Sequence, residues 1–238
     1  MEPAKLKDIR ILTIKDKDYP ANLRFTFTPP KMLYVKGDLS DFDSVAIAVV
    51  GSRTPTAYGI KVTRELVGEL SRNGVTVISG LARGIDTCAH KAALDAGGRT
   101  IAILGSGHYN IYPPENRALA EAICNSGAVI SEFPLQAGPR RENFPRRNRL
   151  ISGLSLGTIV VEAKQKSGSL ITASFALEQG REVFAVPGNI YSKCSEGTNQ
   201  LIKQGAKLVE TIDDIIEEID SFKTIFNKKQ EEQICPSH

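Results

Sequence analysis

The chain has 238 residues, 41% of them hydrophobic and 24% charged, with a formal net charge of +3. This is enough for one large domain with a substantial core, and so small a net charge can matter only through its placement. The four cysteines include no Cys-x-x-Cys pair, which argues against a disulfide framework or a zinc site, and no apolar run approaches transmembrane length. We expect a soluble cytoplasmic protein without a signal peptide or a metal.

Residues 1–40 form a lead-in segment of mixed composition. Pro29-Pro30 and Gly37-Asp38 flank a short apolar run, Met32–Val35. Because proline and glycine pairs punctuate secondary structure, the run is predicted to be a strand. We expect the lead-in to pack on the main domain and to supply one edge strand.

From residue 41 to residue 220, short β-rich runs alternate with amphipathic segments of helical length. Several of the runs are apolar throughout, which is typical of strands in a parallel sheet covered on both faces. Single helices between strands imply right-handed crossovers, so we expect a doubly wound, mostly parallel α/β sheet with helices on both faces. The predicted strands are 45–50, 75–79, 100–104, 128–131, 158–162, 182–186 and 207–210, and the predicted helices 58–73, 87–96, 115–126, 146–156 and 170–179.

The end of the domain contains TIDDIIEEI, residues 211–219. Its four isoleucines fall along one face of a helix. This stripe fits either the core of the domain or an interface with a second copy of the chain, and the sequence leaves both open. Residues 221–238 are predicted to be a polar C-terminal tail.

Glycine, serine and arginine recur in the loops that follow the predicted strands. Ligands of such sheets bind beyond the carboxyl ends of the strands, where glycine permits close backbone approach and helix starts attract anions. Gly51-Ser52-Arg53 is one candidate phosphate loop, with Thr54 as the expected helix cap and Pro55 in the first helical position. Lys166-Ser167-Gly168-Ser169 is another. Neither GxGxxG nor GxxxxGK[ST] occurs, which excludes a P-loop NTPase and argues against a dinucleotide site.

The stretch GPRRENFPRRNRL, residues 138–150, places five arginines and one glutamate around Phe144, so that its local charge of +4 exceeds that of the whole chain. Cations at a helix N-terminus are unfavourable unless an external anion binds there. Exposed aromatic rings stack on the bases of a single strand while cations follow its phosphates. The patch therefore predicts binding of single-stranded nucleic acid through Phe144 and its arginines. The candidates are Arg140, Arg141, Arg146 and Arg149.

The sequence leaves two interpretations of the patch open. It is either a nucleic-acid site or a solvated charged face on which Phe144 anchors the loop. Arg147 lies at helical spacing from Leu150, Ile151 and Leu154, so it also fits an inward position beside a buried acid such as Glu162.

The segments VAIAVVGSRTPTAYG, VISGLARGIDTCAHKAAL, LGSGHYNIYPPEN, NFPRRNRLISGLS and VVEAKQKSGSLITASFALEQGREVFAVPGNI are long and ordered along the chain. In this order they resemble the DNA-processing protein A (DprA/Smf) family from about residue 19 to residue 219. The resemblance implies an extended Rossmann-like domain that binds single-stranded DNA without strict sequence preference. It also implies protection of incoming strands in natural transformation, loading of a RecA-type recombinase, a homodimer, and no cofactor or catalytic reaction.

Many relatives have a small helical module before this domain or a winged-helix-like module after it, and neither is recognisable here. The functions of those modules are therefore not expected of this chain.

The same resemblance also implies which residues contact DNA. These are Arg53, Arg141 and Phe144, the helix start with Arg146, Asn148 and Arg149, and the loop of Lys166, Ser167, Gly168 and Ser169.

A Rossmann-like enzyme that binds or hydrolyses nucleotides is the second hypothesis, with Glu162 beside the Ser167–Ser169 loop as its acid. An enzyme of this kind needs a nucleophile and base, or paired carboxylates. His90, His108 and His238 do not provide such a pair. A third hypothesis, a purely structural or interaction protein, leaves the arginine patch unexplained.

Overall fold

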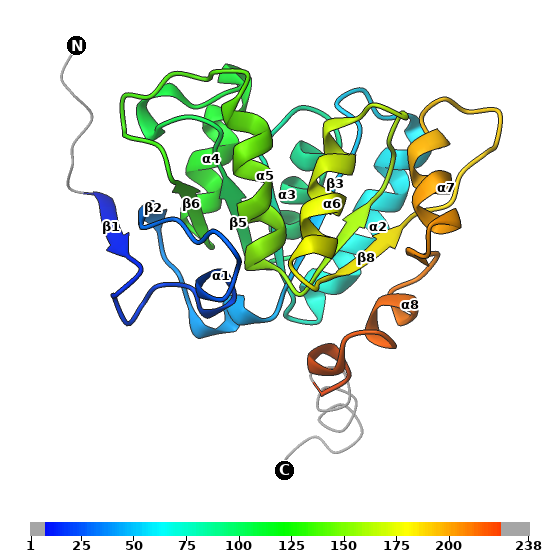
Figure 1. The fold of residues 1–238 in the computed structure, drawn as a ribbon, viewed down its shortest axis with the longest axis horizontal. Coiled ribbons are helices and arrows are strands. Elements are labelled where there is room, and N and C mark those ends of the chain that lie inside the picture. The colour runs from blue at the N-terminus through cyan, green and yellow to red at the C-terminus, as the bar shows by residue number, and fades with distance from the viewer. Residues whose placement is uncertain (1–7, 225–238) are drawn as a thin grey trace.

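The structure is a computed structural model that describes residues 8–224, and within this range it contains one sheet of nine strands (Figure 1). The strand order is β1-β2-β6-β5-β4-β3-β7-β8-β9. Strands β3 to β9 run parallel, and β2 pairs antiparallel with β1 and β6. The strands are β1 (Ile9–Thr13), β2 (Met32–Gly37), β3 (Ala46–Val50), β4 (Thr76–Ser79), β5 (Thr100–Ile103), β6 (Ala128–Ser131), β7 (Gly157–Val160), β8 (Glu182–Ala185) and β9 (Lys207–Leu208).

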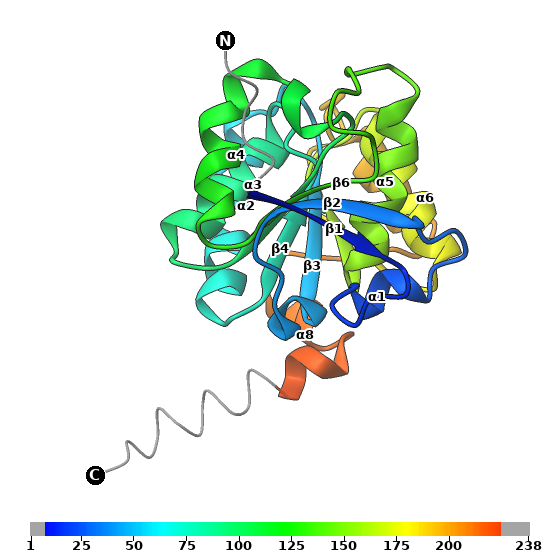
Figure 2. The same ribbon diagram turned by 90° about the vertical axis from the view of Figure 1, so that its left-hand side faces the viewer.

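Helices cover both faces of this sheet, as Figure 2 shows with α2, α3 and α4 on one side and α1, α5 and α6 on the other. Strands β3 to β6 are buried at every position, which explains why their sequences are apolar rather than alternating. The helices are α1 (Ala21–Arg24), α2 (Ala57–Arg72), α3 (Ile85–Asp95), α4 (Arg117–Cys124), α5 (Asn143–Leu154), α6 (Gly168–Glu178), α7 (Glu196–Lys203) and α8 (Asp213–Ile216), with short 3₁₀ helices at Asp41–Ser44, His108–Asn110 and Pro114–Asn116. The predicted doubly wound α/β fold is confirmed.

The order of the strands reverses between β3 and β7. The chain moves from β3 through β4 and β5 to β6, then returns through α5 to place β7 on the other side of β3. Crevices at such a reversal, beyond the carboxyl ends of the strands, are the usual ligand sites of open α/β sheets. The loops after β3 and β7 border this crevice.

The lead-in segment adds two strands to the sheet, where the sequence predicted one. Strand β2 extends the sheet beyond β6, and β1 becomes its edge. Strand β1 escaped prediction because only Leu12 of its residues is fully buried, whereas Ile11 is half exposed. An edge strand of mixed composition has no clear pattern. The turn between the strands is fixed by Tyr19, whose hydroxyl donates to the Pro30 carbonyl at 2.8 Å.

The isoleucine stripe of residues 211–219 belongs to the core. Ile212, Ile215 and Ile219 are buried together with Phe222 in the cluster that α2 and α3 form on the sheet. Of the four isoleucines, only Ile216 is partly exposed. The interpretation as a core element is therefore the correct one. Among the helices of residues 8–224, none has the length and apolar character required to cross a membrane.

We predict that Ile215→Ala lowers the free energy of unfolding by about 2–5 kcal/mol, because it leaves a cavity among fully buried side chains. Ile216→Ala, one residue further and partly exposed, is the matched control and should cost clearly less. Urea unfolding of both variants measures the difference. Equal losses would contradict the assignment of the stripe to the core.

Candidate nucleic-acid interface

The loops after β3, β4, β5 and β6 meet at one rim of the sheet. A shallow hollow there is lined by Arg53 after β3, Arg83 after β4, Tyr112 after β5 and Phe144 at the start of α5. Its floor includes Gly80, the residue that follows β4. Cationic and aromatic side chains from four separate segments therefore converge, because parallel strands bring all these loops to the same edge.

Phe144 lines this hollow and is only partly buried. The Arg53 guanidinium carbon lies 5.7 Å from the centre of its ring, and Tyr112 makes a tilted contact at 5.8 Å between ring centres and 59° between planes. A Cβ atom at Gly105 would lie 2.8 Å from the ring, so only glycine leaves room for it. Phe144 thus anchors the loop with one part of its ring and leaves the rest accessible.

Arg147 is the buried member of the patch, with 3% of its surface exposed. Its Nη1 donates to the carbonyl of Gly80 at 2.6 Å and also to that of Ile103. Gly80 directly follows β4, and Ile103 is the last residue of β5. The guanidinium therefore links the first turns of α5 to the ends of two strands. Of the two positions that the sequence left open for Arg147, the structure has the inward one.

The acid that faces Arg147 is Asp86, where the sequence suggested Glu162. The Asp86 carboxylate accepts from the backbone N–H of Gly80 at 3.1 Å and of Ala82 at 3.3 Å. A Cβ atom at Gly80 would lie 2.7 Å from both Arg147 Nη2 and Asp86 Oδ2. Burial raises the pKa of Asp86, which the charge of Arg147 opposes, and burial lowers the pKa of Arg147 to about 10, which Asp86 opposes. Arg147 therefore remains charged at neutral pH.

Glu132, which follows β6, holds two further arginines. Its nearly buried carboxylate lies 2.5 Å from Arg149 Nη2 and 3.1 Å from Arg146 Nη2. Arg149 also donates to the Thr28 carbonyl at 2.7 Å, and only 14% of its side chain is exposed. Arg146 keeps 61% of its side chain exposed. Arg149 thus fastens α5 to the lead-in segment, while Arg146 stays accessible.

The other arginines of the rim are exposed cations. Arg53, Arg140 and Arg141 form no salt bridge with an acid of the described residues 8–224. Free cations near a partly exposed ring are what a polyanion with flat bases requires.

The loop after β7 brings a second kind of anion site to the rim. Ser167 caps α6 and accepts from the Ser169 N–H at 3.3 Å, while Lys166 and Gly168 are exposed. Asn148 Nδ2 donates to the Gly168 carbonyl at 3.2 Å, which links this loop to α5. The first N–H groups of a helix lack intrahelical acceptors, so this turn can bind an anion. Asn148 is nearly buried and supports the loop from behind.

The start of α2 differs from its prediction. Thr56 caps the helix, which begins at Ala57, so Thr54 and Pro55 remain in the loop. Glu162 accepts from both the backbone N–H and the hydroxyl of Thr56, at 2.9 and 2.5 Å, and is 2% exposed. With both oxygens bonded in the interior, Glu162 is a structural partner of α2. This removes the acid on which the nucleotide-hydrolase hypothesis depended.

The two histidines of residues 8–224 offer no replacement, and His238 lies outside the described residues. His90 is completely buried with Nδ1 2.7 Å from Thr100 Oγ1, and burial lowers its pKa to about 3. His108 is buried against the Tyr34 carbonyl. No group of three His, Cys, Asp or Glu side chains in residues 8–224 lies close enough together to bind a metal ion.

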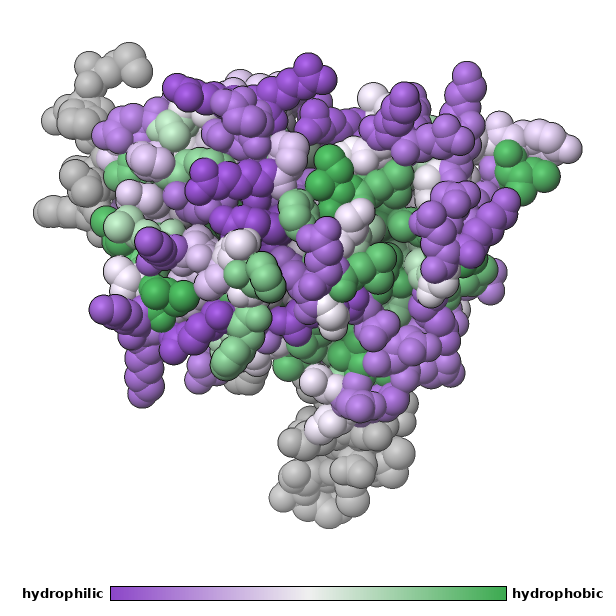
Figure 3. Space-filling model, in the orientation of Figure 1, coloured by the Kyte–Doolittle hydropathy of each residue, from purple (hydrophilic) through white to green (hydrophobic). Residues whose placement is uncertain are grey.

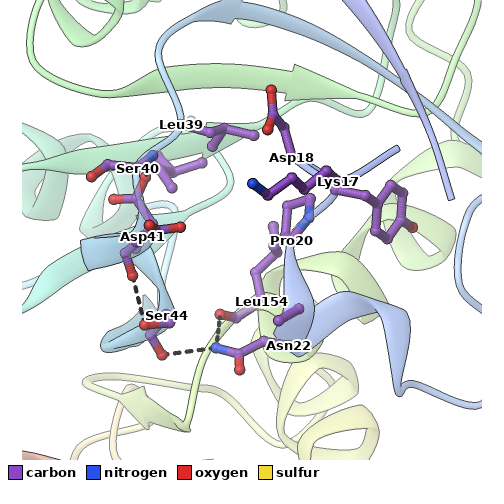
Figure 4. Close-up of a pocket in the computed structure, with 13 residues that line it drawn as sticks. Lys17, Asp18, Pro20, Asn22, Leu39, Ser40, Asp41, Ser44 and Leu154 are labelled. Carbon is purple, nitrogen blue, oxygen red and sulfur yellow. Dashed lines mark hydrogen bonds between the residues drawn. The ribbon is translucent and has the colours of Figure 1, made fainter. Parts of the chain in front are cut away.

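A separate cavity of about 410 Å³ lies away from this rim, between the lead-in segment and the amino ends of β3 and β5 (Figure 4). Asn22 Nδ2 bridges its two walls by donating to the carbonyls of Ser44 and Leu154. Asp18, Asp41 and Lys17 line it, so its mouth has no cationic excess. It does not resemble the rim and is not part of the candidate interface.

Residues 10–220 match the family described as DNA recombination-mediator protein A. The chain belongs to this family. Protein Smf of Escherichia coli is 52% identical over 202 residues, which are 84% of this chain and 54% of that protein. This chain therefore spans about half the length of that relative.

Two solved structures of the family superpose closely on this one. DNA processing protein A from Streptococcus pneumoniae has a TM-score of 0.84 and 43% identity, and the match covers 89% of this chain and 74% of that one. DNA processing protein A from Helicobacter pylori, described as having a unique single-stranded DNA binding mode, has a TM-score of 0.79 and 32% identity. That match covers 88% of this chain and 94% of that one.

Sequence reasoning missed two residues of the hollow, Arg83 and Tyr112. Arg83 Nε donates to Glu115 at 2.5 Å and its guanidinium carbon lies 6.0 Å from the centre of the Tyr112 ring. Neither residue belongs to a charged run in the sequence. Their position after β4 and β5 was a usable signal, because the strands beside β3 must deliver their loops to the same rim.

We predict that Arg147→Met destabilises the protein by about 3–5 kcal/mol, because Asp86 would be left buried without its cation. Arg141→Ala, in the same patch but exposed, should leave stability within about 0.5 kcal/mol of the wild type. Urea unfolding distinguishes the two. Adding Asp86→Asn to Arg147→Met should recover part of the loss, and no recovery would mean that the two charges are not coupled.

Proposed function

We propose that this protein binds single-stranded DNA along the carboxyl rim of its sheet and acts as a recombination mediator without an enzymatic reaction of its own. The observation that supports this best is the hollow in which Arg53, Arg83 and Tyr112 surround the accessible part of Phe144. Stacking on a ring and charge neutralisation together suit a flexible polyanion whose bases are unpaired. The likeness to a Helicobacter pylori protein described as binding single-stranded DNA supports the same proposal.

The path of the strand follows from the exposed groups. Phe144 would stack on one base, with Arg53, Arg140, Arg141 and Arg146 on neighbouring phosphates. The turn formed by Lys166, Ser167, Gly168 and Ser169 would bind a further phosphate across the crevice between β3 and β7, beside Gly51 and Ser52. Asn148 and Arg149 would keep these loops in place, since their polar groups already have partners within the protein.

Binding of single-stranded DNA would serve a wider activity, which concerns the longer proteins of the family as well as this chain. We propose that binding protects incoming strands and helps to load a RecA-type recombinase in natural transformation, in the cytoplasm. The family description as a recombination mediator supports this. The experiment that tests it is recombinase-dependent strand exchange with DNA covered by single-strand-binding protein, with and without this chain.

Single-stranded DNA should bind more tightly than duplex DNA of the same length, with a log–log salt slope of roughly −2 to −3.5 per protomer for three to five phosphates. Phe144→Ala should weaken single-strand binding by about 1–3 kcal/mol at any base sequence, because the stacking surface is lost. Fluorescence anisotropy of labelled oligonucleotides at two salt concentrations measures both effects.

The controls for this prediction separate contact from folding. Phe144→Tyr retains a ring and should bind nearly as the wild type does. Lys223→Ala removes an exposed cation at the far end of the molecule and should leave affinity unchanged, whereas Arg53→Ala should reduce both affinity and the salt slope. Wild-type affinity in a folded Phe144→Ala protein would refute stacking.

We also propose that the protein forms a homodimer through α6. Ten of the eleven residues of this helix are uncharged, yet Leu177 is 62% and Ile171 39% exposed. Figure 3 shows hydrophobic surface gathered over α6 on this face. A helix that is apolar on all sides is normally covered on all sides. Apart from Glu178 at its last position, α6 offers no charge for a charged partner to recognise, so a second copy of the same face is the best-matched occupant.

Leu177→Arg should convert the dimer to a monomer in sedimentation velocity experiments, because it places a charge in the apolar contact. Phe27→Arg is the matched control, since Phe27 is 97% exposed on the lead-in segment, and it should leave the dimer intact. A wild-type protein that sediments as a monomer at micromolar concentration would contradict the proposal.

A further inference from the structure

The loop after β8, residues 187–195, lies beyond the binding path described above. Tyr191 is 90% exposed and Ile190 79% exposed, the former among the most exposed aromatic side chains of the described residues. In Figure 1 the loop projects from the upper edge of the molecule beside α7. Large exposed side chains at the carboxyl ends of the strands are at the place where ligands of this fold bind.

The loop is held at its base and across its tip. Gly188 N–H donates to Asn199 Oδ1 at 3.2 Å, and Asn199 Nδ2 donates back to the Gly188 carbonyl at 3.0 Å. The Tyr191 N–H donates to Asn189 Oδ1 at 2.8 Å. The Tyr58 hydroxyl donates to the Pro187 carbonyl at 2.8 Å. The exposed phenol ring is therefore presented by a fixed backbone, which lowers the entropic cost of binding to it.

This loop adjoins the phosphate loop at the start of α6. The Ala163 N–H donates to the Cys194 carbonyl at 2.8 Å, and the Gly197 N–H donates to the Ala163 carbonyl at 2.7 Å. Residues 163–169 and 187–195 together contain three lysines and no acid. All three lysines, Lys164, Lys166 and Lys193, are exposed. The nearest exposed acid along the chain is Glu196, at the first position of α7.

We propose that Tyr191, Lys164 and Lys193 form a second stacking subsite for single-stranded nucleic acid, which continues the path past the Ser167–Ser169 turn. One base stacks on the Tyr191 ring while the two lysines bind the adjoining phosphates. This inference rests on the proposed function, because it extends the same strand from Phe144 at one end of the rim to Tyr191 at the other. The binding site of one protomer then has two aromatic ends with cations between them.

A polyanion fits this surface better than a protein partner does. The three exposed lysines of residues 163–169 and 187–195 would repel a basic protein surface, whereas they attract phosphates. The same arrangement of ring and cations is the general device for binding single strands. A protein partner would use Ile190 and Tyr191 together, which gives the test its control.

The test is a series of oligothymidylates of increasing length, bound to the full chain and measured by fluorescence anisotropy. Tyr191→Ala should leave short oligonucleotides, which reach only the Phe144 half, bound as by the wild type. For longer ones it should weaken binding about 5- to 10-fold, which is the lower part of the range expected when one base loses its stacking partner. Tyr191→Phe should retain the wild-type affinity at every length, and Ile190→Ala should have no effect.

The lysines and the ring can each be tested separately. Lys164→Ala with Lys193→Ala should reduce the magnitude of the salt slope for long strands by about 1.4, since each phosphate contact contributes about 0.7. The chain contains no tryptophan, so Tyr191→Trp introduces a single indole as a reporter. Its fluorescence should be quenched by long oligonucleotides but not by short ones.

The outcomes separate this inference from the proposed function. If the wild type binds short single strands but Tyr191→Ala binds long ones equally well, the subsite does not exist and the central site stands. If Ile190→Ala weakens binding or alters sedimentation as much as Tyr191→Ala does, the loop is an apolar contact with protein, and the subsite is refuted. If the wild type binds no single strand of any length, the proposed function fails and this inference fails with it.

Discussion

The rim depends on one buried cation. Arg147 enters the interior from the first turns of α5 and donates to the carbonyls at the ends of β4 and β5. A guanidinium in this place carries a large desolvation cost, which two carbonyls and the carboxylate of Asp86 offset. The contacts fix where α5 begins above the sheet. Because Phe144 and Arg146 lie in the same turn, their exposed positions follow from the burial of their neighbour.

The arginines of residues 138–150 therefore divide into two groups by their partners. Arg147 and Arg149 have partners inside the protein and give the loop its shape, while Arg140, Arg141 and Arg146 face solvent. A loop of free arginines alone would have no fixed form, and fully paired arginines would leave nothing for an anion. Glu132 contacts one arginine of each group. It neutralises the largely buried Arg149 and binds the exposed Arg146 through a single longer contact.

Most of the sheet could be predicted because its central strands are buried on both faces, and such strands have continuous apolar sequences. Strand β1 had no such run, since an edge strand needs only one buried side chain in five residues. In the site, composition located the arginines but could not sort them, because Arg147 and Arg146 are adjacent and chemically identical. Only the strand order shows that the inward side of α5 meets Gly80 and Ile103. Arg83 and Tyr112 were missed for the same reason, since the fold, and not the sequence pattern, brings them to Phe144.

The chemistry of the hollow also bears on selectivity. Its walls are two guanidinium groups and two rings, and its floor includes the backbone at Gly80, where any side chain would collide with Arg147. Gly105 lies behind the Phe144 ring, where any side chain would collide with it. Base edges are distinguished by paired donors and acceptors, chiefly amide and carboxylate side chains. The amides of α5 are already engaged within the protein, since Asn143 donates to the Gly138 carbonyl and Asn148 binds Gly168 and Arg147. Rings and cations recognise features common to all nucleotides, so the same packing that makes the hollow also removes the means to read a sequence. A surface built in this way suits strands that are flexible and charged, whatever their base sequence.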